Sequence, residues 1–409
     1  MSWSVRGLED ARVEFVMIAR EAEVNMSAVC RDFGVSRKSG YKWLRRYETS
    51  GLDGLKNQSR RPRSSPLQLS GDAVVALVKL HDAHDDWGPK KLRARLIRDS
   101  SCPDNKVPSL ATVARLTRRM GWSETKGRGR PRPQRALPTA PLSGAELPNR
   151  VWTVDFKGWW RTRDGQRCEP LTVRDLYSRY ILCLRPMAWR NAEAIGKAFA
   201  EVFRRYGLPD ILRSDNGSPF ASITGPCGLT RLSAWWLSLG IRPERIAPGH
   251  PEQNGGHERM HGDIARAVQS NPAATVAEET VRLERWRMDF NTERPHEALD
   301  MKTPGDVYRC SPRRLADVKP YVYPAGFDRR RVQEDGCIHF RGQCVNFSEA
   351  LGKMEVGLQP VSESRWRVWF CDLAVGGLEF RNGRIRRCPA AENLPPGDGN
   401  CNPCPDNKV

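Results

Sequence analysis

The spacing of hydrophobic residues changes twice along the chain. Up to about residue 122, apolar residues recur every three to four positions in short blocks, which predicts amphipathic helices. From about residue 150 to residue 315, short apolar runs alternate with helical patterns, which predicts a mixed α/β domain. Between residues 321 and 387 only short β-type runs remain, separated by glycines. The pattern therefore predicts a multidomain α+β protein.

The first predicted helices lie between Val13 and Tyr47. Ser27 is predicted to cap one helix and Ser36 the next, with a turn at Gly34 between them. This is the pattern of a helix-turn-helix unit, whose second helix enters the major groove of DNA, and a plain helical bundle is the alternative. DNA binding is favoured because the second helix exposes five basic residues. They are Arg37, Lys38, Lys42, Arg45 and Arg46.

A second helical unit is predicted from helices at residues 72–84, 90–99 and 110–120. Basic residues on its last two helices make it a second helix-turn-helix candidate, with a purely structural bundle as the alternative. These residues are Lys90, Lys91, Arg93, Arg115, Arg118 and Arg119.

The following segment, residues 126–133, contains Arg-Gly-Arg-Pro, which is similar to the core of an AT-hook. In an AT-hook, arginines such as Arg128 and Arg130 enter a narrow minor groove. A flexible basic linker that touches only phosphates is the favoured interpretation.

Strands are predicted at residues 151–160, 171–173, 180–184 and 210–213, with a helix at 192–206 before the last of them. Three strands in succession, then a helix and a strand, indicate a mixed sheet. Farther along, short runs between residues 337 and 380 predict a small β-barrel. The barrel has a basic rim, and a structural cap without DNA contact is the alternative. The rim residues are Arg329, Arg330, Arg331, Arg384, Arg386 and Arg387.

These patterns divide the chain into seven segments. They are a helix-turn-helix domain (1–58), a linker (59–70), a second helix-turn-helix-like domain (71–122), a basic linker (123–147), the mixed α/β core (148–315), the β-barrel (320–388) and a disordered Pro/Gly-rich tail (389–409).

The composition is that of a globular protein of 409 residues, 39% of them hydrophobic and 28% charged. No stretch approaches the roughly 18 consecutive apolar residues of a membrane span, and no signal peptide is recognisable, so a cytoplasmic, nucleoid-associated protein is expected. Of the 12 cysteines only Cys401 and Cys404 have a C-x-x-C spacing. Reduced thiols are therefore favoured over a zinc site or a disulfide framework.

The formal net charge of +19 is concentrated at one end of the chain. Residues 1–135 contain 28 Lys and Arg against 15 Asp and Glu. An excess of this kind indicates a polyanionic partner that is contacted mainly by the N-terminal third.

Three acidic residues stand out by position. Asp155 lies inside a predicted strand, where a buried charge is costly unless it faces a partner or a metal. Asp215 ends the fourth strand of the core, where strand ends line the crevice of an α/β sheet. Glu258 lies one turn inside a helix that two glycines open, and Glu252 is a rival for its role.

Three carboxylates suit phosphodiester cleavage, because two divalent ions about 4 Å apart can activate the attacking group and stabilise the leaving oxygen. Hard oxygen ligands select Mg²⁺ or Mn²⁺. Asp155 is expected to bridge the two ions, with Asp215 on one ion and Glu258 on the other. His250, His257 and His261 are expected to contact DNA or line the helix, not to bind zinc.

Three segments then carry a resemblance to a known family: residues 152–158 (Trp-Thr-Val-Asp-Phe-Lys-Gly), 214–220 (Ser-Asp-Asn-Gly-Ser-Pro-Phe) and 254–259 (Asn-Gly-Gly-His-Glu-Arg). In this order they resemble the Asp-Asp-Glu signature of insertion-sequence transposases with a retroviral-integrase core. Residues 291–299 also resemble the segment that closes this core in bacterial members. The 42 residues between Asp215 and Glu258 are several more than the family's usual spacing, and a surface-loop insertion around residues 224–228 would explain them.

The resemblance implies a ribonuclease H-like core and a transposase that binds the terminal inverted repeats of a mobile element. It also implies metal-dependent cleavage and strand transfer on double-stranded DNA, and at least a dimer on that DNA. Lys157, Asn216, Asn254 and Arg259 are expected to contact the DNA near the acids. A catalytically silent DNA-binding repressor and a ribonuclease H-like nuclease that does not join DNA stay open as alternatives.

Overall fold

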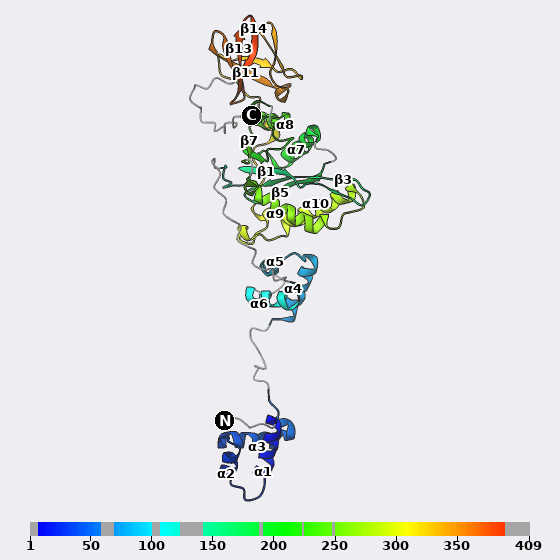
Figure 1. The fold of residues 1–409 in the computed structure, drawn as a ribbon, viewed down its shortest axis with the longest axis vertical. Helices are drawn as coiled ribbons and strands as arrows, with labels where there is room; N and C mark the ends of the chain where they lie inside the picture. Colours follow the sequence, from blue (N-terminus) through cyan, green and yellow to red (C-terminus); the bar gives the residue numbers. More distant parts are fainter. Residues whose placement is uncertain are drawn as a thin grey trace. The chain divides into compact units, whose positions relative to one another are not determined.

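The computed structural model describes seven stretches of the chain (Figure 1). They are residues 7–58, 69–99, 107–122, 142–187, 191–222, 225–247 and 250–388, without the side chains of Leu8, Pro251 and Glu252. Most of the two predicted linkers, with Arg128 and Arg130, and the predicted tail lie outside these residues. The chain divides into two units between Ser70 and Gly71.

The first unit is a bundle of three helices and one 3₁₀ turn. They are α1 (Leu8–Ala19), α2 (Met26–Asp32), α3 (Arg37–Ser50) and η1 (Gly51–Leu55). Its core includes Phe15 and Cys30, and α3 crosses them at Gly40. A Cβ atom at Gly40 would lie 2.7 Å from Phe15 Cζ and from Cys30 Sγ, so only glycine permits this approach.

The capping residues of this unit are only partly as predicted. Ser36 caps α3, because its hydroxyl accepts a hydrogen bond from the backbone N–H of Ser39 at 3.2 Å. The prediction for Ser27 is wrong. The N-cap of α2 is Asn25, whose side chain accepts from the backbone N–H groups of Ser27 and Ala28. The helix begins earlier than predicted because Asn is as good a cap as Ser.

The second unit begins with three helices, α4 (Gly71–Ala83), α5 (Pro89–Arg98) and α6 (Leu110–Arg119). Basic residues of α5 pair with carboxylates of the central domain: Lys90 with Glu297 at 2.6 Å and Arg98 with Asp306 at 2.8 Å. The basic residues Arg115, Arg118 and Arg119 of α6 are exposed instead. Helix α5 therefore attaches this helical domain to the central domain, and the basic side chains of α6 face solvent.

Five strands form the sheet of the central domain, in the order β5-β4-β1-β6-β7. Their bounds are Val151–Phe156 (β1), Pro170–Asp175 (β4), Ile181–Pro186 (β5), Ile211–Ser214 (β6) and Arg242–Arg245 (β7). Strand β1 is antiparallel to β4 and parallel to β6. The predicted first strand is shorter than expected, because Gly158 has a positive φ of 87° and turns the chain into the hairpin β2–β3 (Trp160–Arg161 and Arg167–Cys168).

Helices cover both faces of this sheet (Figure 1). One face packs on α7 (Ala192–Tyr206) and α8 (Arg231–Ser238), the other on α9 (Gly255–Ile264) and α10 (Val276–Thr292). Side chains alternate along β1, so Trp152 and Val154 enter the core under α7 and α8. Thr153 and Asp155 consequently face α9. The predicted mixed α/β core is confirmed.

Shorter turns connect these elements. They are η3 (Pro226–Gly228), η4 (Pro251–Asn254), the π-helical turn η5 (Ala265–Gln269), η6 (Glu297–Leu299), α11 (Pro304–Val307), η7 (Leu315–Asp317) and η8 (Glu349–Leu351).

The C-terminal domain is a curled antiparallel sheet, in the order β14-β13-β12-β11-β8, with a hairpin β9–β10. The strands are Asp328–Arg331 (β8), Cys337–Phe340 (β9), Gln343–Asn346 (β10), Glu355–Ser362 (β11), Arg365–Phe370 (β12), Leu373–Arg381 (β13) and Arg384–Cys388 (β14). Gln343 closes the curl by bonding to Gly383 and Ile385. The predicted basic rim lies on β8 and β14, the two ends of the five-strand order, and both strands were missed from the sequence.

The loop expected to be a surface insertion packs against this C-terminal sheet. Pro226 and Gly228 are buried, and Cys227 Sγ lies 3.4 Å from the backbone oxygen of Ala374. Residues 223 and 224 lie outside the described part. The described cysteines are all free thiols, as predicted. No helix among the described residues is both long and apolar enough to cross a membrane.

Asn291 provides a test of how α10 is held on the edge strand β5. Its fully buried amide accepts from the N–H of Ile181 at 2.9 Å and donates to the oxygen of Ile181 at 3.0 Å. Asn291→Ala leaves that N–H unpaired, so the free energy of unfolding should fall by about 1–3 kcal/mol in chemical denaturation. The exposed Asn346→Ala is the control and should change it by less than about 0.5 kcal/mol. Equal effects of the two substitutions would contradict this role.

Candidate active site

Asp155 and Asp215 lie at the carboxyl ends of adjacent parallel strands. Strand β1 pairs with β6 in the register Val151 with Ile211 and Thr153 with Arg213. Asp155 and Asp215 each lie two residues beyond the last printed pair, so the same register, continued past the paired stretch, would place them opposite each other. Because β1 and β6 are parallel, their carboxyl ends, with both acids, lie at the same edge of the sheet.

Each aspartate is oriented by nearby donors. Asp155 Oδ1 accepts from the backbone N–H of Phe156 at 2.8 Å, and its Oδ2 accepts from Asn254 Nδ2 at 3.2 Å. Asp215 Oδ1 accepts from the N–H of Gly217 at 3.2 Å, in the turn that follows β6.

Helix α9, which carries Glu258, begins beside Asp155. Asn254, the residue before the helix, contacts Asp155, and Glu258 lies four positions later. Residues four apart share one side of a helix, so Glu258 follows Asn254 along the side that meets the strand end. The Glu258 side chain is exposed, and no hydrogen bond joins it to a described residue. Glu252, the rival third acid, has a side chain outside the described part.

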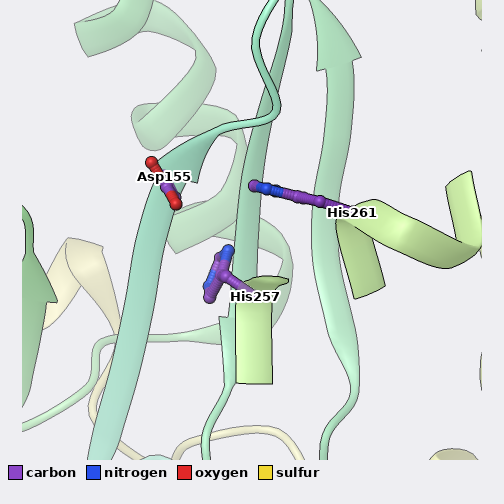
Figure 2. Close-up of side chains that lie close together, drawn as sticks. All are labelled: Asp155, His257 and His261. Carbon is purple, nitrogen blue, oxygen red and sulfur yellow. The ribbon is translucent and has the colours of Figure 1, made fainter. Parts of the chain in front are cut away.

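His257 attaches α9 to the sheet (Figure 2). Its ring is 1% exposed, with Nε2 2.6 Å from Thr153 Oγ1 and Nδ1 3.1 Å from Thr172 Oγ1. The Thr172 hydroxyl donates its one proton to the backbone oxygen of Asp155 at 2.9 Å, so it accepts from His257. His257 is then a neutral ring with a proton on Nδ1, and its Nε2 accepts from Thr153.

His261, one turn farther along α9, completes the network. Its Nε2 lies 3.0 Å from the same Thr172 hydroxyl. Burial, reinforced by Lys157 and Arg174, lowers the pKa of His261 to about 3. Burial also holds the pKa of His257 well below its usual value, with Arg174 as the next cause. Both rings are therefore uncharged at neutral pH.

Asp155, His257 and His261 could be considered as a metal site, because their ligand atoms lie within 4.8 Å of one another (Figure 2). Both nitrogens of His257, however, are engaged by threonine hydroxyls, and so is Nε2 of His261. The pair therefore positions α9. The acids at the strand ends offer oxygen atoms instead, which suit Mg²⁺ or Mn²⁺.

The other residues expected near DNA have varied surroundings. Lys157 Nζ donates to Gln269 at 3.0 Å, and Asn216 Nδ2 donates to the oxygen of Ile246 at 2.7 Å. Arg259 is exposed. On α3 of the first unit, Arg37, Lys38, Lys42 and Arg45 are exposed. Arg46 is half-buried, with its guanidinium 4.8 Å from the ring centre of Trp43.

Thr153, Thr172 and the inward orientation of the two histidines were not predicted from the sequence. Two signals were available. Thr153 and Asp155 are two apart on one strand, and His257 and His261 are four apart on one helix, so each pair shares a face. His257 was expected to contact DNA or to line the helix; its ring is buried against the sheet, which excludes the DNA contact and agrees with the second alternative.

Family comparisons match most of the described chain. Two models of an integrase core domain match residues 145–251 and 239–304. Together these ranges contain Asp155, Asp215 and Glu258. A helix-turn-helix domain matches residues 12–63, and a homeodomain-like domain matches residues 39–117.

Individual proteins are also similar. The chain is 27% identical over 260 residues to the insertion element IS407 uncharacterized 31.7 kDa protein of Burkholderia multivorans, across 62% of this chain and 84% of the relative. The HTLV-2 integrase catalytic core domain in complex with magnesium aligns with 41% of this chain and all of that chain, at 16% identity and a TM-score of 0.32. A simian T-cell lymphotropic virus intasome in complex with PP2A regulatory subunit B56 gamma aligns with 72% of this chain and 98% of that chain, at 17% identity and a TM-score of 0.36.

The burial of His261 predicts a pH-dependent stability. Its pKa is about 3 in the folded chain and 6.5 as the ordinary value, so the unfolded state binds more protons between these limits. The free energy of unfolding should therefore fall as the pH drops below about 6.5, by up to about 1.4 kcal/mol per pH unit. In His261→Asn, measured with EDTA, the fall between about pH 6 and pH 4 should be smaller by about 2 kcal/mol. The exposed His339→Asn should keep the wild-type dependence, and identical curves for all three proteins would exclude this origin.

Proposed function

We propose that this chain, which belongs to the insertion-element transposases of the integrase superfamily, binds the terminal inverted repeats of a mobile DNA element and cleaves and joins DNA there. Asp155, Asp215 and Glu258 are the proposed catalytic acids. The observation that carries the proposal is the β1–β6 register, which brings two acids from distant motifs to one sheet edge under the helix that carries the third.

Two divalent ions, Mg²⁺ or Mn²⁺, are proposed to occupy this site, with Asp155 shared between them. When bound, such ions lower the pKa of an attacking water or hydroxyl and neutralise charge on the scissile phosphate. The donor set fits them, because the acids provide carboxylate oxygens and the nearby histidine nitrogens are engaged elsewhere.

The chain's own residues would keep the acids in place for this chemistry. Asn254 holds one oxygen of Asp155 and the Phe156 N–H holds the other, which leaves the carboxylate a fixed orientation. The backbone N–H of Gly217 holds one oxygen of Asp215. His257 fixes the helix that carries Glu258. Preorganisation of this kind is what two-metal sites require of the protein.

DNA recognition is proposed for the helix-turn-helix domains, with α3 in the major groove and the exposed arginines of α6 on backbone phosphates. Lys157, Asn216, Asn254 and Arg259 would lie beside the DNA end at the site. Joining two element ends needs two sites, so we propose at least a dimer on the DNA, acting at the nucleoid.

The catalytic assignment is tested with Asp155→Ala, Asp215→Ala and Glu258→Ala. The assay incubates each protein with Mg²⁺ and a labelled duplex that ends in the inverted repeat flanking its gene, and scores cleaved and joined products. Each substitution should lower both by at least about 100-fold, since loss of a metal ligand exceeds the cost of losing a supporting residue. DNA affinity should stay within about threefold, and the exposed Glu193→Ala should be fully active.

The wild-type result separates the alternatives. Joined product that disappears in Asp155→Ala supports a transposase. Cleavage without joining would indicate a nuclease, and binding without either product would indicate a repressor. Activity retained in the triple variant would show that the acids are wrongly assigned.

The role of α3 is tested with Lys42→Ala combined with Arg45→Ala. Each phosphate contact contributes about 0.9 to the slope of log affinity against log salt concentration, so the slope should fall by about 1.8. Lys56→Ala is the control, because Lys56 pairs with Asp53 at 2.7 Å outside α3. An unchanged slope in the double variant would exclude these two residues from the DNA contact.

A further inference from the structure

Three arginines near the acids make no ion pair with a described residue. They are Arg174 on β4, Arg179 in the turn after β4, and Arg259 on α9. Among the described residues, none of the three makes a hydrogen bond or an ion pair through its side chain. The Nε atom of Arg174 is buried without any partner.

Other buried arginines of the central domain are paired with acids. Arg213, Arg287 and Arg294 lie 2.6 Å, 2.6 Å and 2.9 Å from Glu244, Glu284 and Asp263, respectively. Arg174 is 5% exposed, as buried as these three, yet makes no ion pair; the neighbouring Asp175 attracts it, but that carboxylate accepts from the N–H groups of Asn149 and Ser178. A buried cation without a direct ion pair is costly, so an anion from outside the chain would stabilise it.

The Arg174 guanidinium packs against the start of α9. Arg174 pairs with Thr153 across the strands, so it lies on the same face as Thr153 and Asp155. Gly256, in the first turn of α9, lies directly on its guanidinium: a Cβ atom there would be 2.8 Å from Nη1. The N-terminus of a helix is itself positive, so the helix adds to the charge of Arg174.

Arg179 and Arg259 add positive charge near Arg174, and both are more exposed than Arg174. Burial lowers the pKa of Arg174 to about 10, and repulsion from Arg179 and then Arg259 adds to the shift. Burial and Arg259 likewise lower the pKa of Arg179. Exposure increases from Arg174 through Arg179 to Arg259. Arg179 also lines a hollow of about 520 Å³ with Tyr177 and Lys302.

We propose that Arg174, Arg179 and Arg259 bind a backbone phosphate of the DNA strand held at the candidate active site. Guanidinium groups bind phosphate oxygens in pairs, and a helix N-terminus adds to the attraction. Thr172 faces Asp155 across the strands, and Arg174 is two residues farther along β4. This diagonal spacing is about 7–8 Å, close to the distance between successive phosphates of one strand. The inference rests on the proposed function, since it names a contact of the same DNA.

The test uses full-length protein in EDTA, so that binding is measured without chemistry. Duplex ends carry one uncharged methylphosphonate at each position in turn around the cleavage site. For the wild type, one or two adjacent positions should weaken binding about tenfold, the value of a charged hydrogen bond. Arg259→Ala and Arg174→Met should each weaken binding to unmodified DNA by about tenfold and should lose sensitivity to those positions.

Arg185→Ala is the matched control, because Arg185 is half-exposed on β5 and pairs with Glu201 at 2.8 Å. It should keep both the wild-type affinity and the position-dependent effect. Thermal unfolding without DNA gives a second readout. Arg174→Met removes an uncompensated buried charge, so its Tm should rise by about 2–4 °C, whereas a structural role for Arg174 would make Tm fall.

Several outcomes would overturn the inference. One is wild-type affinity in Arg259→Ala and Arg174→Met while Asp155→Ala still abolishes chemistry, in which case the proposed function stands alone. Another is a methylphosphonate effect that is the same in the variants as in the wild type. A third is stabilisation by inorganic phosphate with no dependence on DNA position, which would assign the arginines to a free anion. A fall of Tm in Arg174→Met would show that Arg174 has a structural role and does not belong to the phosphate site. DNA binding by Arg259→Ala would then decide whether Arg179 and Arg259 form the site.

Discussion

The buried ring of His257 is the contact on which the arrangement of the acids depends. It bonds to Thr153 on β1 and to Thr172 on β4, and Thr172 in turn holds the backbone of Asp155. Because a neutral imidazole has one donor and one acceptor nitrogen, these bonds also fix which nitrogen carries the proton. Glu258 is the next residue in the chain. Its position relative to Asp155 therefore follows from a hydrogen-bond network that contains neither side chain.

Opposite charges are kept apart around this network. The site acids are held by amide and backbone donors, while the nearest arginines are left without acids. Ion pairs between the site acids and these arginines would stabilise the free protein, but they would neutralise the charges of both. Leaving the arginines without an ion pair costs stability, which a phosphate bound to them would offset in a DNA complex.

The positive charge of the chain serves several purposes. On α3 of the first unit most of it is exposed, whereas on α5 it pairs with Glu297 and Asp306 of the central domain. In the C-terminal domain it follows β8 and β14, the outer strands of the five-strand sheet, where charged side chains oppose pairing with another chain. A net charge alone therefore overstates the surface that is available for DNA.

The order and type of most elements could be predicted from local patterns. Helix α7 was predicted at Ala192–Tyr206 with its observed bounds, because apolar periodicity and the flanking turn residues act over a few positions. Strands β8 and β14 were not predicted, because their arginines interrupt the alternation of apolar and polar residues expected of a strand. Helix α8 was missed as well, since its neighbours lie partly in the C-terminal domain.

For the candidate site, the proposed catalytic acids could be chosen from the sequence alone, since Asp155, Asp215 and Glu258 stand in motifs that can be recognised locally. The sequence could not determine that His257 turns inward, that Arg174 lacks an acid, or that α5 binds the core. Each of these depends on residues about 80 to 200 positions away in the chain, brought together by strand register and helix packing. Pairing and burial are properties of that assembly, and only the tertiary structure decided them.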